Sequence, residues 1–280
     1  MTTAISDAFK GLRKRGEGAL IGYVTGGDPS PKYTPLVVEA LVEGGVDIVE
    51  IGVPFSDPIA DGPVIQSSVN RALKAGTTPQ TIFKIARRLS KRIDTPTVLL
   101  TYYNILHRMG VNRFLREASE NGVSGLIVPD LPFEEGVEYR EDAVKQGLDT
   151  IFLASPSTPK SRLESIVNYT SGFLYLISVF GVTGVRKNVD PLTIRVIAEV
   201  KPYVEKTIPL AVGFGVSKPE HVRVIINHGA DGVIAGSVFV KTMEKNLRAR
   251  SQLREALTAK AGKLKAATLP MSNTACPSEE

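Results

Sequence analysis

Eight short apolar runs recur along the chain, and their alternation with helical stretches constrains the fold more than any other feature. Most of the runs are rich in β-branched residues and end in or near Gly, Pro, Ser or Asp, which is typical of buried parallel strands. The runs span residues 19–25, 47–53, 97–103, 125–131, 150–156, 173–179, 210–216 and 232–238.

The stretches between these runs show helical periodicity, as in residues 35–42 and 82–89. Eight strand–helix units imply a parallel sheet with right-handed crossovers, and eight is the number that closes a barrel. We therefore predict an α/β fold, a (β/α)8 TIM barrel, with an open doubly wound sheet as the alternative. Several predicted helices end in glycines suited to a C′ position with positive φ: Gly44-Gly45, Gly122, Gly147 and Gly229.

The two ends of the chain set the expected domain boundaries. Ser6-Asp7 can cap an extra N-terminal helix that would cover the floor of the barrel. A chain of 280 residues, 42% of them hydrophobic, is long enough for one large domain. We predict a single barrel over residues 1–267 and a disordered C-terminal tail over residues 268–280, where periodicity is lost.

The net charge of +5 is concentrated in residues 248–265, which carry six basic side chains and one acid. Apolar residues recur there at helical spacing, which indicates an amphipathic helix with a solvated basic face. No aromatic residues interleave with these charges, so we expect no nucleic-acid site. A single Cys, no signal-peptide pattern and no apolar run of ~18 residues predict a cytoplasmic protein outside the membrane.

Glu50 stands inside the second apolar run, where an acid is unexpected. Side chains alternate along a strand, so the all-apolar face of Val49 and Ile51 should pack on helices and Glu50 should point into the barrel. A carboxylate there is costly unless paired or used, and none of the eight runs carries Lys or Arg. The loop that follows carries Asp57 and Asp61 at the end of the barrel where active sites lie. We predict that Glu50 and Asp61 form an acid/base pair.

Glycine-rich turns stand at or just after the ends of the last three runs, at residues 181–184, 213–215 and 235–237. Backbone N–H groups at such turns bind dianions, above all where a short helix begins, as the chain can do at Gly236-Ser237. The three histidines are not clustered with carboxylates at metal spacing, the strands carry no Lys for a Schiff base, and no GxGxxG follows the first run. These features together predict acid/base chemistry on a phosphorylated small molecule, with no metal and no cofactor in this chain.

The segment DIVEIGVPFSDPIADGPVIQ closely resembles the signature of the tryptophan synthase α subunit family. GYVTGGDP, GFLYLISVFGVTG, AVGFGVS and IAGSVFVK match the ends of the family's first, sixth, seventh and eighth strands, and the resemblance covers roughly residues 5–267. It implies a carbon–carbon lyase of tryptophan biosynthesis that cleaves indole-3-glycerol phosphate to indole and glyceraldehyde 3-phosphate in a retro-aldol reaction.

The resemblance also implies roles for individual residues. Glu50 and Asp61 match the catalytic acids, Tyr175 matches a tyrosine beside the glutamate, and Thr183 matches a loop threonine that meets Asp61. The implied indole pocket consists of Tyr23, Ile65, Leu100, Tyr102, Ile127 and Phe214. The implied phosphate ligands are Gly184, Gly215, Gly236 and Ser237.

The family works with a pyridoxal-phosphate β subunit in an α2β2 complex, so by resemblance the cofactor belongs to that partner. The implied docking surface includes residues 55–58, Asn104 and Pro132. The apolar stretch 102–106 suits either an interface or an ordinary capping turn. At Val179 many members carry a polar residue, so contacts that hold the closed sixth loop are absent here or replaced by Arg186 or Lys187.

Two other functions are compatible with parts of this pattern. Another phosphate-binding barrel enzyme, such as an isomerase or synthase of the same pathway, would share the glycine turns but lack the spacing of Glu50 and Asp61. A regulatory module without catalysis would be expected to lose one carboxylate, and this chain keeps both. The lyase is therefore the favoured prediction.

Overall fold

The computed structural model describes residues 3–177, 189–213, 215–247 and 249–269. The strands within these ranges form one sheet in which all neighbours are parallel, in the order β5-β4-β3-β2-β1-β9-β8-β7-β6. The strands are β1 (Ala19–Thr25), β2 (Ile48–Gly52), β3 (Thr97–Leu100), β4 (Gly125–Ile127), β5 (Asp149–Ile151), β6 (Leu153–Ala154), β7 (Leu174–Ile177), β8 (Leu210–Gly213) and β9 (Gly232–Ala235).

The two edges of this sheet belong to one apolar run. β5 and β6 are separated only by Phe152; β5 pairs with β4, and β6 pairs with β7. The Tyr175 backbone N–H donates to the Phe152 carbonyl over 3.1 Å. The run therefore closes the sheet on itself, which confirms the TIM barrel and excludes the open doubly wound sheet.

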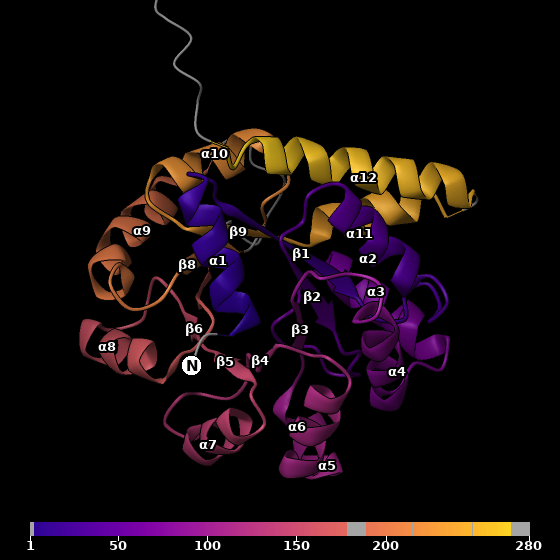
Figure 1. Ribbon diagram of the computed structural model, residues 1–280, viewed down its shortest axis with the longest axis horizontal. Coiled ribbons are helices and arrows are strands. Elements are labelled where there is room, and N and C mark those ends of the chain that lie inside the picture. Colours follow the sequence, from indigo (N-terminus) through magenta and orange to yellow (C-terminus); the bar gives the residue numbers. More distant parts are fainter. Residues whose placement is uncertain (1–2, 178–188, 214, 248, 270–280) are drawn as a thin grey trace, which may run out of the picture.

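Helices surround the strands (Figure 1). They are α1 (Ala4–Lys14), α2 (Thr34–Glu43), α3 (Pro63–Lys74), α4 (Pro79–Leu89), α5 (Tyr103–Met109), α6 (Val111–Glu120), α7 (Val137–Lys145), α8 (Lys160–Tyr169), α9 (Pro191–Val204), α10 (Pro219–Asn227), α11 (Ser237–Lys245) and α12 (Arg250–Ala266). The predicted turn glycines Gly45, Gly122, Gly147 and Gly229 all have positive φ, whereas Gly44, the C-cap residue of α2, has a φ of −79°.

The N-terminal helix covers the floor of the barrel, as predicted. In Figure 1 α1 lies over the centre of the ring formed by the strands. Its buried Ile5, Phe9 and Leu12 join the apolar cluster that fills the barrel, and the rings of Phe9 and Phe173 lie 5.9 Å apart. This packing closes the end of the barrel opposite the candidate site.

The cap of α1 differs from the prediction. Thr3 is the N-cap, and its hydroxyl accepts from the Ser6 backbone N–H over 3.2 Å. The Ser6 hydroxyl in turn accepts from the Thr3 backbone N–H over 2.9 Å. Ser6 and Asp7 therefore lie inside the first turn, and Ser6 is the third helical residue of a reciprocal capping box. The sequence predicts the cap at Ser6-Asp7, three residues too late.

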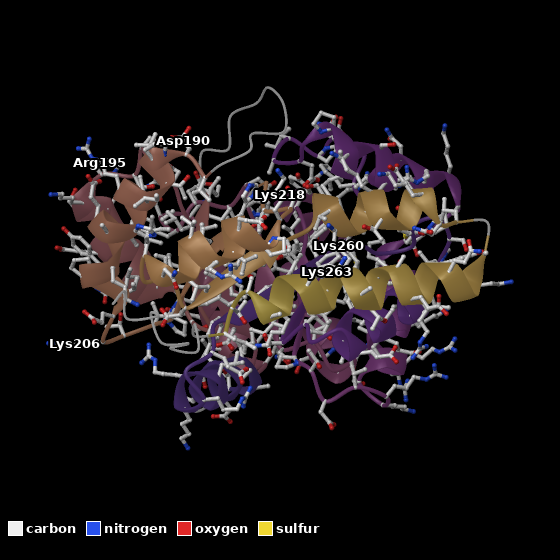
Figure 2. The ribbon with its side chains drawn as sticks, turned by 90° about the horizontal axis from the view of Figure 1, so that it is seen from above. Asp190, Arg195, Lys206, Lys218, Lys260 and Lys263 are labelled. Carbon is white, nitrogen blue, oxygen red and sulfur yellow. The ribbon has the colours of Figure 1, made fainter. Side chains whose placement is uncertain are left out.

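The C-terminal helix α12 is amphipathic, as predicted. Leu253, Leu257 and Leu264 are fully buried, whereas Lys263 is exposed and lies with Lys260 on the same helix in Figure 2. Thr268 is also buried, and its carbonyl accepts from the Gly18 N–H over 3.0 Å. The tail boundary at 268 stays a prediction, since residues 270–280 lie outside the described ranges.

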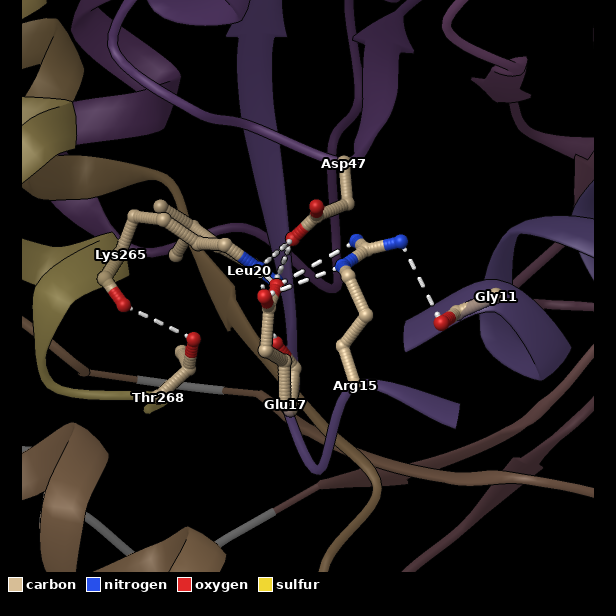
Figure 3. A network of polar contacts seen from close by, with 8 residues as sticks. Gly11, Arg15, Glu17, Leu20, Asp47, Lys265 and Thr268 are labelled. Atoms are coloured by element: carbon tan, nitrogen blue, oxygen red, sulfur yellow. Dashed lines mark hydrogen bonds and ion pairs between the residues drawn. The ribbon is translucent and has the colours of Figure 1, made fainter. Parts of the chain in front are cut away.

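Lys265 ties α12 to the beginnings of β1 and β2 (Figure 3). Its ammonium lies 2.9 Å from the carboxylate of Asp47 and 3.1 Å from that of Glu17. The same Asp47 carboxylate accepts from the Leu20 backbone N–H over 2.8 Å. Burial raises the pKa of Asp47, while the Leu20 bond and the Lys265 charge oppose that rise. The network therefore holds three chain segments together at the floor of the barrel.

The third apolar run is shorter as a strand than predicted, because β3 ends at Leu100 and α5 begins at Tyr103. Within the stretch 102–106, Tyr102, Ile105 and Leu106 are buried and Asn104 is exposed. The apolar members therefore pack inside this chain, and only Asn104 is fully open to a partner. No helix in the described ranges is long and apolar enough to cross a membrane.

Candidate active site

Glu50 points into the barrel from the middle of β2. Its neighbours Val49 and Ile51 pack in the cluster between sheet and helices, as the alternation predicted, and Glu50 itself is 1% exposed. Its Oε2 is bonded by none of the residues that the structure describes. Burial, with a smaller contribution from the charge of Asp61, raises the pKa of Glu50 from 4.5 to about 8. At neutral pH this carboxyl group is therefore protonated and can donate a proton.

Asp61 lies in the loop between β2 and α3 and is half-buried. The Tyr102 hydroxyl donates to its Oδ2 over 3.2 Å and accepts from the Ala60 N–H over 3.0 Å. Burial raises the pKa of Asp61 from 3.8 to about 6, and the Tyr102 bond opposes that rise. At pH 7 Asp61 is mostly ionised while Glu50 is mostly protonated. Two carboxyl groups with pKa values pushed apart are suited to separate acid and charge-stabilising roles.

Two further tyrosines enter the barrel beside these acids. Tyr23 and Tyr175 are 6% and 7% exposed, and burial raises the pKa of both phenols well above 10. The charge of Glu50 raises the pKa of Tyr175 further, and that of Asp61 raises the pKa of Tyr23 further. Both phenols are therefore neutral, and their pKa values respond to the carboxylate pair.

Each of these phenols rests on a glycine of the next strand. A Cβ on Gly52 would lie 2.3 Å from the Tyr23 Oη, and one on Gly213 would lie 2.5 Å from the Tyr175 Oη. Both contacts are too short for any side chain. The glycines at the ends of β2 and β8 therefore create the space in which the two phenols lie.

Hydroxyl groups connect Tyr23 to α3. The Tyr23 Oη lies 3.2 Å from Thr25 Oγ1, which lies 2.6 Å from Ser68 Oγ. Ser68 donates its proton to the Ile65 carbonyl over 2.7 Å, so the direction of donation runs from Tyr23 through Thr25 to Ser68. This buried chain fixes the first turns of α3, the helix that follows Asp61.

Half-buried aliphatic side chains line the end of the barrel near the carboxylates. Leu100 pairs with Ile127 across β3 and β4, and both join the apolar cluster of the barrel. Leu153, which pairs with Tyr175 across β6 and β7, and Ile177, the last residue of β7, border a cavity of ≈ 250 Å³. The sequence pattern did not single out these two residues, although each stands two residues beyond an inward-facing residue, Ile151 or Tyr175.

The candidate phosphate site is only partly described. Gly236 is the N-cap of α11, Ser237 is its first residue, and Gly215 has a φ of +79°. A Cβ on Gly236 would lie 3.1 Å from the Tyr23 ring, so this turn packs closely on β1. The remaining predicted residues of the site and of the sixth loop lie outside the described ranges: Val179, Thr183, Gly184, Arg186, Lys187 and Phe214.

The fold and the site define an acid/base enzyme built on a (β/α)8 barrel. A model of the family described as tryptophan synthase alpha chain matches residues 9–269. The chain is 48% identical to the tryptophan synthase alpha chain of Methanoregula boonei over 84% of this chain and 88% of that one. It is 45% identical to that of Methanosarcina acetivorans over 95% and 94%.

Solved structures agree with these relatives. The tryptophan synthase subunit alpha of Legionella pneumophila matches with a TM-score of 0.87 and 31% identity, over 96% of this chain and 99% of that one. A chain of the tryptophan synthase complex of Pyrococcus furiosus matches with a TM-score of 0.82 and 40% identity, over 89% and 98%. The chain belongs to the tryptophan synthase alpha chain family, whose members are lyases of tryptophan biosynthesis that cleave indole-3-glycerol phosphate to indole and glyceraldehyde 3-phosphate.

Proposed function

We propose that Glu50 is the proton carrier and Asp61 the charge stabiliser in the cleavage of indole-3-glycerol phosphate. The observation that carries this proposal is the unequal setting of the two carboxyl groups: Glu50 is 1% exposed with Oε2 unbonded among the described residues, whereas Asp61 is half-buried and accepts from Tyr102. Burial accordingly raises the pKa of Glu50 to about 8 and that of Asp61 to about 6, which favours a protonated Glu50 and an ionised Asp61 near pH 7. Each group then begins the reaction in the form that its role requires.

The reaction begins with transfer of the Glu50 proton to C3 of the indole ring, which makes C3 tetrahedral and the ring an indolenium ion. Positive charge develops on the ring nitrogen, where the Asp61 carboxylate stabilises it. The Glu50 carboxylate then removes the proton from the glycerol hydroxyl next to C3. The hydroxyl becomes an aldehyde, and the electron pair of the broken carbon–carbon bond returns to the ring. Glu50 ends protonated, so it gains and loses one proton per turnover.

The remaining site residues bind and orient the substrate in this proposal. The apolar wall of Leu100 and Ile127, together with Ile65, holds the indole ring, while Tyr175 lies beside Glu50. Backbone N–H groups at Gly215, Gly236 and Ser237 hold the phosphate, helped by the positive end of α11. Tyr102 acts through Asp61, because its hydroxyl donates to that carboxylate.

We further propose that the chain works in the cytoplasm with a β subunit in an α2β2 complex, and that pyridoxal phosphate belongs to that partner. Support comes from the solved Pyrococcus furiosus structure, which is described as a tryptophan synthase complex. The proposed docking surface comprises residues 55–58, Asn104 and Pro132. Ser56, Asp57 and Asn104 are exposed, and Ile59 beside them is 81% exposed, which is unusual for an apolar side chain outside an interface.

Indole release from indole-3-glycerol phosphate tests the function. The purified chain is assayed alone and with a β subunit of tryptophan synthase, and indole and glyceraldehyde 3-phosphate are measured together. Equal amounts of both products are expected. No indole in either condition would refute the lyase function for this chain.

A further inference from the structure

Arg71 on α3 joins three elements that surround the active site. Its Nε and Nη2 donate to Oδ1 and Oδ2 of Asp28 over 2.7 and 2.8 Å. Its Nη1 forms an ion pair with Glu244 of α11 and donates to Ser67 Oγ over 3.1 Å. The guanidinium thus binds the loop after β1 with one edge and α11 with the other.

The position of these contacts relates them to the two ends of the substrate. α3 begins two residues after Asp61, so any shift of this helix moves the carboxylate loop. α11 begins at Ser237, so its N-terminus presents the proposed phosphate site. Arg71 therefore connects the element that positions the catalytic carboxylate with the element that receives the phosphate.

The two halves of this contact differ in what they do for stability. The Asp28 side chain is fully buried, and burial raises its pKa while Arg71 lowers it. Removing Arg71 would leave a buried carboxylate without its bidentate partner, and such losses destabilise a fold strongly. Glu244 is 36% exposed, and exposed ion pairs contribute little to stability. The Glu244 contact can thus be broken with little effect on folding.

We propose that Arg71 is a positioning residue that couples phosphate binding at α11 to the placement of Asp61, through the ion pair with Glu244. This inference rests on the proposed function. When phosphate orders the N-terminus of α11, the Arg71–Glu244 contact transmits that order to α3 and so to the Asp61 loop. A merely structural ion pair would affect all substrates alike, whereas a coupling contact affects only the reaction in which phosphate is bound.

The test separates the phosphate from the rest of the substrate. Indole-3-glycerol, which lacks the phosphate, is cleaved by the parent chain with and without added phosphite dianion, and indole release is measured. The variant is Glu244→Gln, which removes one charge and keeps the shape. The matched control is Glu199→Gln, which breaks the exposed Arg195–Glu199 pair on α9. Unfolding midpoints in urea confirm that both variants fold.

We expect phosphite to accelerate cleavage in the parent chain and in the control. In Glu244→Gln the acceleration should fall about 5-fold or more, the lower limit of typical coupling between sites, while the rate without phosphite stays unchanged. Equal acceleration in variant and parent would overturn the proposal, as would no acceleration in the parent or an equal loss with and without phosphite. A parent chain that releases no indole from indole-3-glycerol phosphate would instead refute the proposed function.

Discussion

The substitution Glu50→Gln should increase the stability of the fold and, at the same time, abolish catalysis. The structure encloses Glu50 in the barrel at 1% exposure, with Oε2 unbonded among the described residues, and the pKa rises from 4.5 to about 8. The unfolded chain ionises this group near pH 4.5, whereas the folded chain keeps its proton until about pH 8. The folded state therefore binds more protons than the unfolded state within this window, so the stability of the parent falls as pH rises through it.

The size of this effect follows from the difference between the two pKa values. Between pH 5 and pH 8 the unfolded chain, with a pKa of 4.5, goes from about three-quarters ionised to fully ionised, whereas the folded chain keeps most of this proton until about pH 8. Integrated over that interval, the free energy of unfolding of the parent falls by about 3 kcal/mol through this group alone. Glutamine does not titrate, so the variant lacks this fall.

Urea denaturation of parent and Glu50→Gln from pH 5 to pH 9 measures the difference. The stability advantage of the variant should grow by about 3 kcal/mol between pH 5 and pH 8 and level off above it. Other titrating groups are common to both proteins and cancel. A difference that does not change with pH would mean that Glu50 ionises normally, and the reasoning that makes it a proton donor would fail.

Further predictions concern the neighbours of this group and the floor of the barrel. The kcat/KM of the parent should fall below pH about 6 and above pH about 8. In Tyr102→Phe the acid limb of this profile should move to higher pH, because the hydrogen bond from Tyr102 lowers the pKa of Asp61 and its loss raises that pKa. Gly213→Ala should lower kcat about 100-fold by displacing the phenol on β7, measured as indole release, and an unchanged kcat would show that this phenol has no fixed role. Lys265→Met should cost about 2 kcal/mol in urea denaturation because the half-buried Asp47 and Glu17 lose the ammonium that bridges them, whereas the exposed control Lys263→Met should stay within about 0.5 kcal/mol.

The inward orientation of Glu50 could be predicted from strand alternation alone. A strand buried on both faces has one side toward the helices and one toward the barrel axis. The apolar Val49 and Ile51 identify the side toward the helices, so Glu50 must face the barrel axis. Closure of the barrel could be predicted from the number of runs. The division of the fifth run at Phe152 into two short strands could not, because nothing in a uniformly apolar run marks where its hydrogen bonding changes partner.

The hydrogen-bond partners of the site were less predictable. The family resemblance implies that Tyr102 lies in the indole pocket, and only the structure reveals that its hydroxyl donates to Asp61. That contact joins residues 41 positions apart on two different loops, whose mutual approach depends on how the whole barrel packs. The same reason hid Arg71, which looks like one of many charged residues on an exposed helix until Asp28 and Glu244 are brought beside it.

The role of Glu50 as the proton carrier can be decided by one comparison. Turnover of indole-3-glycerol phosphate and the Kd for glycerol phosphate are measured for the parent and for Glu50→Gln in the same preparations. We predict that kcat falls at least about 100-fold, as expected for loss of a general acid, while the Kd changes less than about 2-fold. A variant that binds glycerol phosphate normally and still releases indole at the parental rate would show that Glu50 is not the proton carrier.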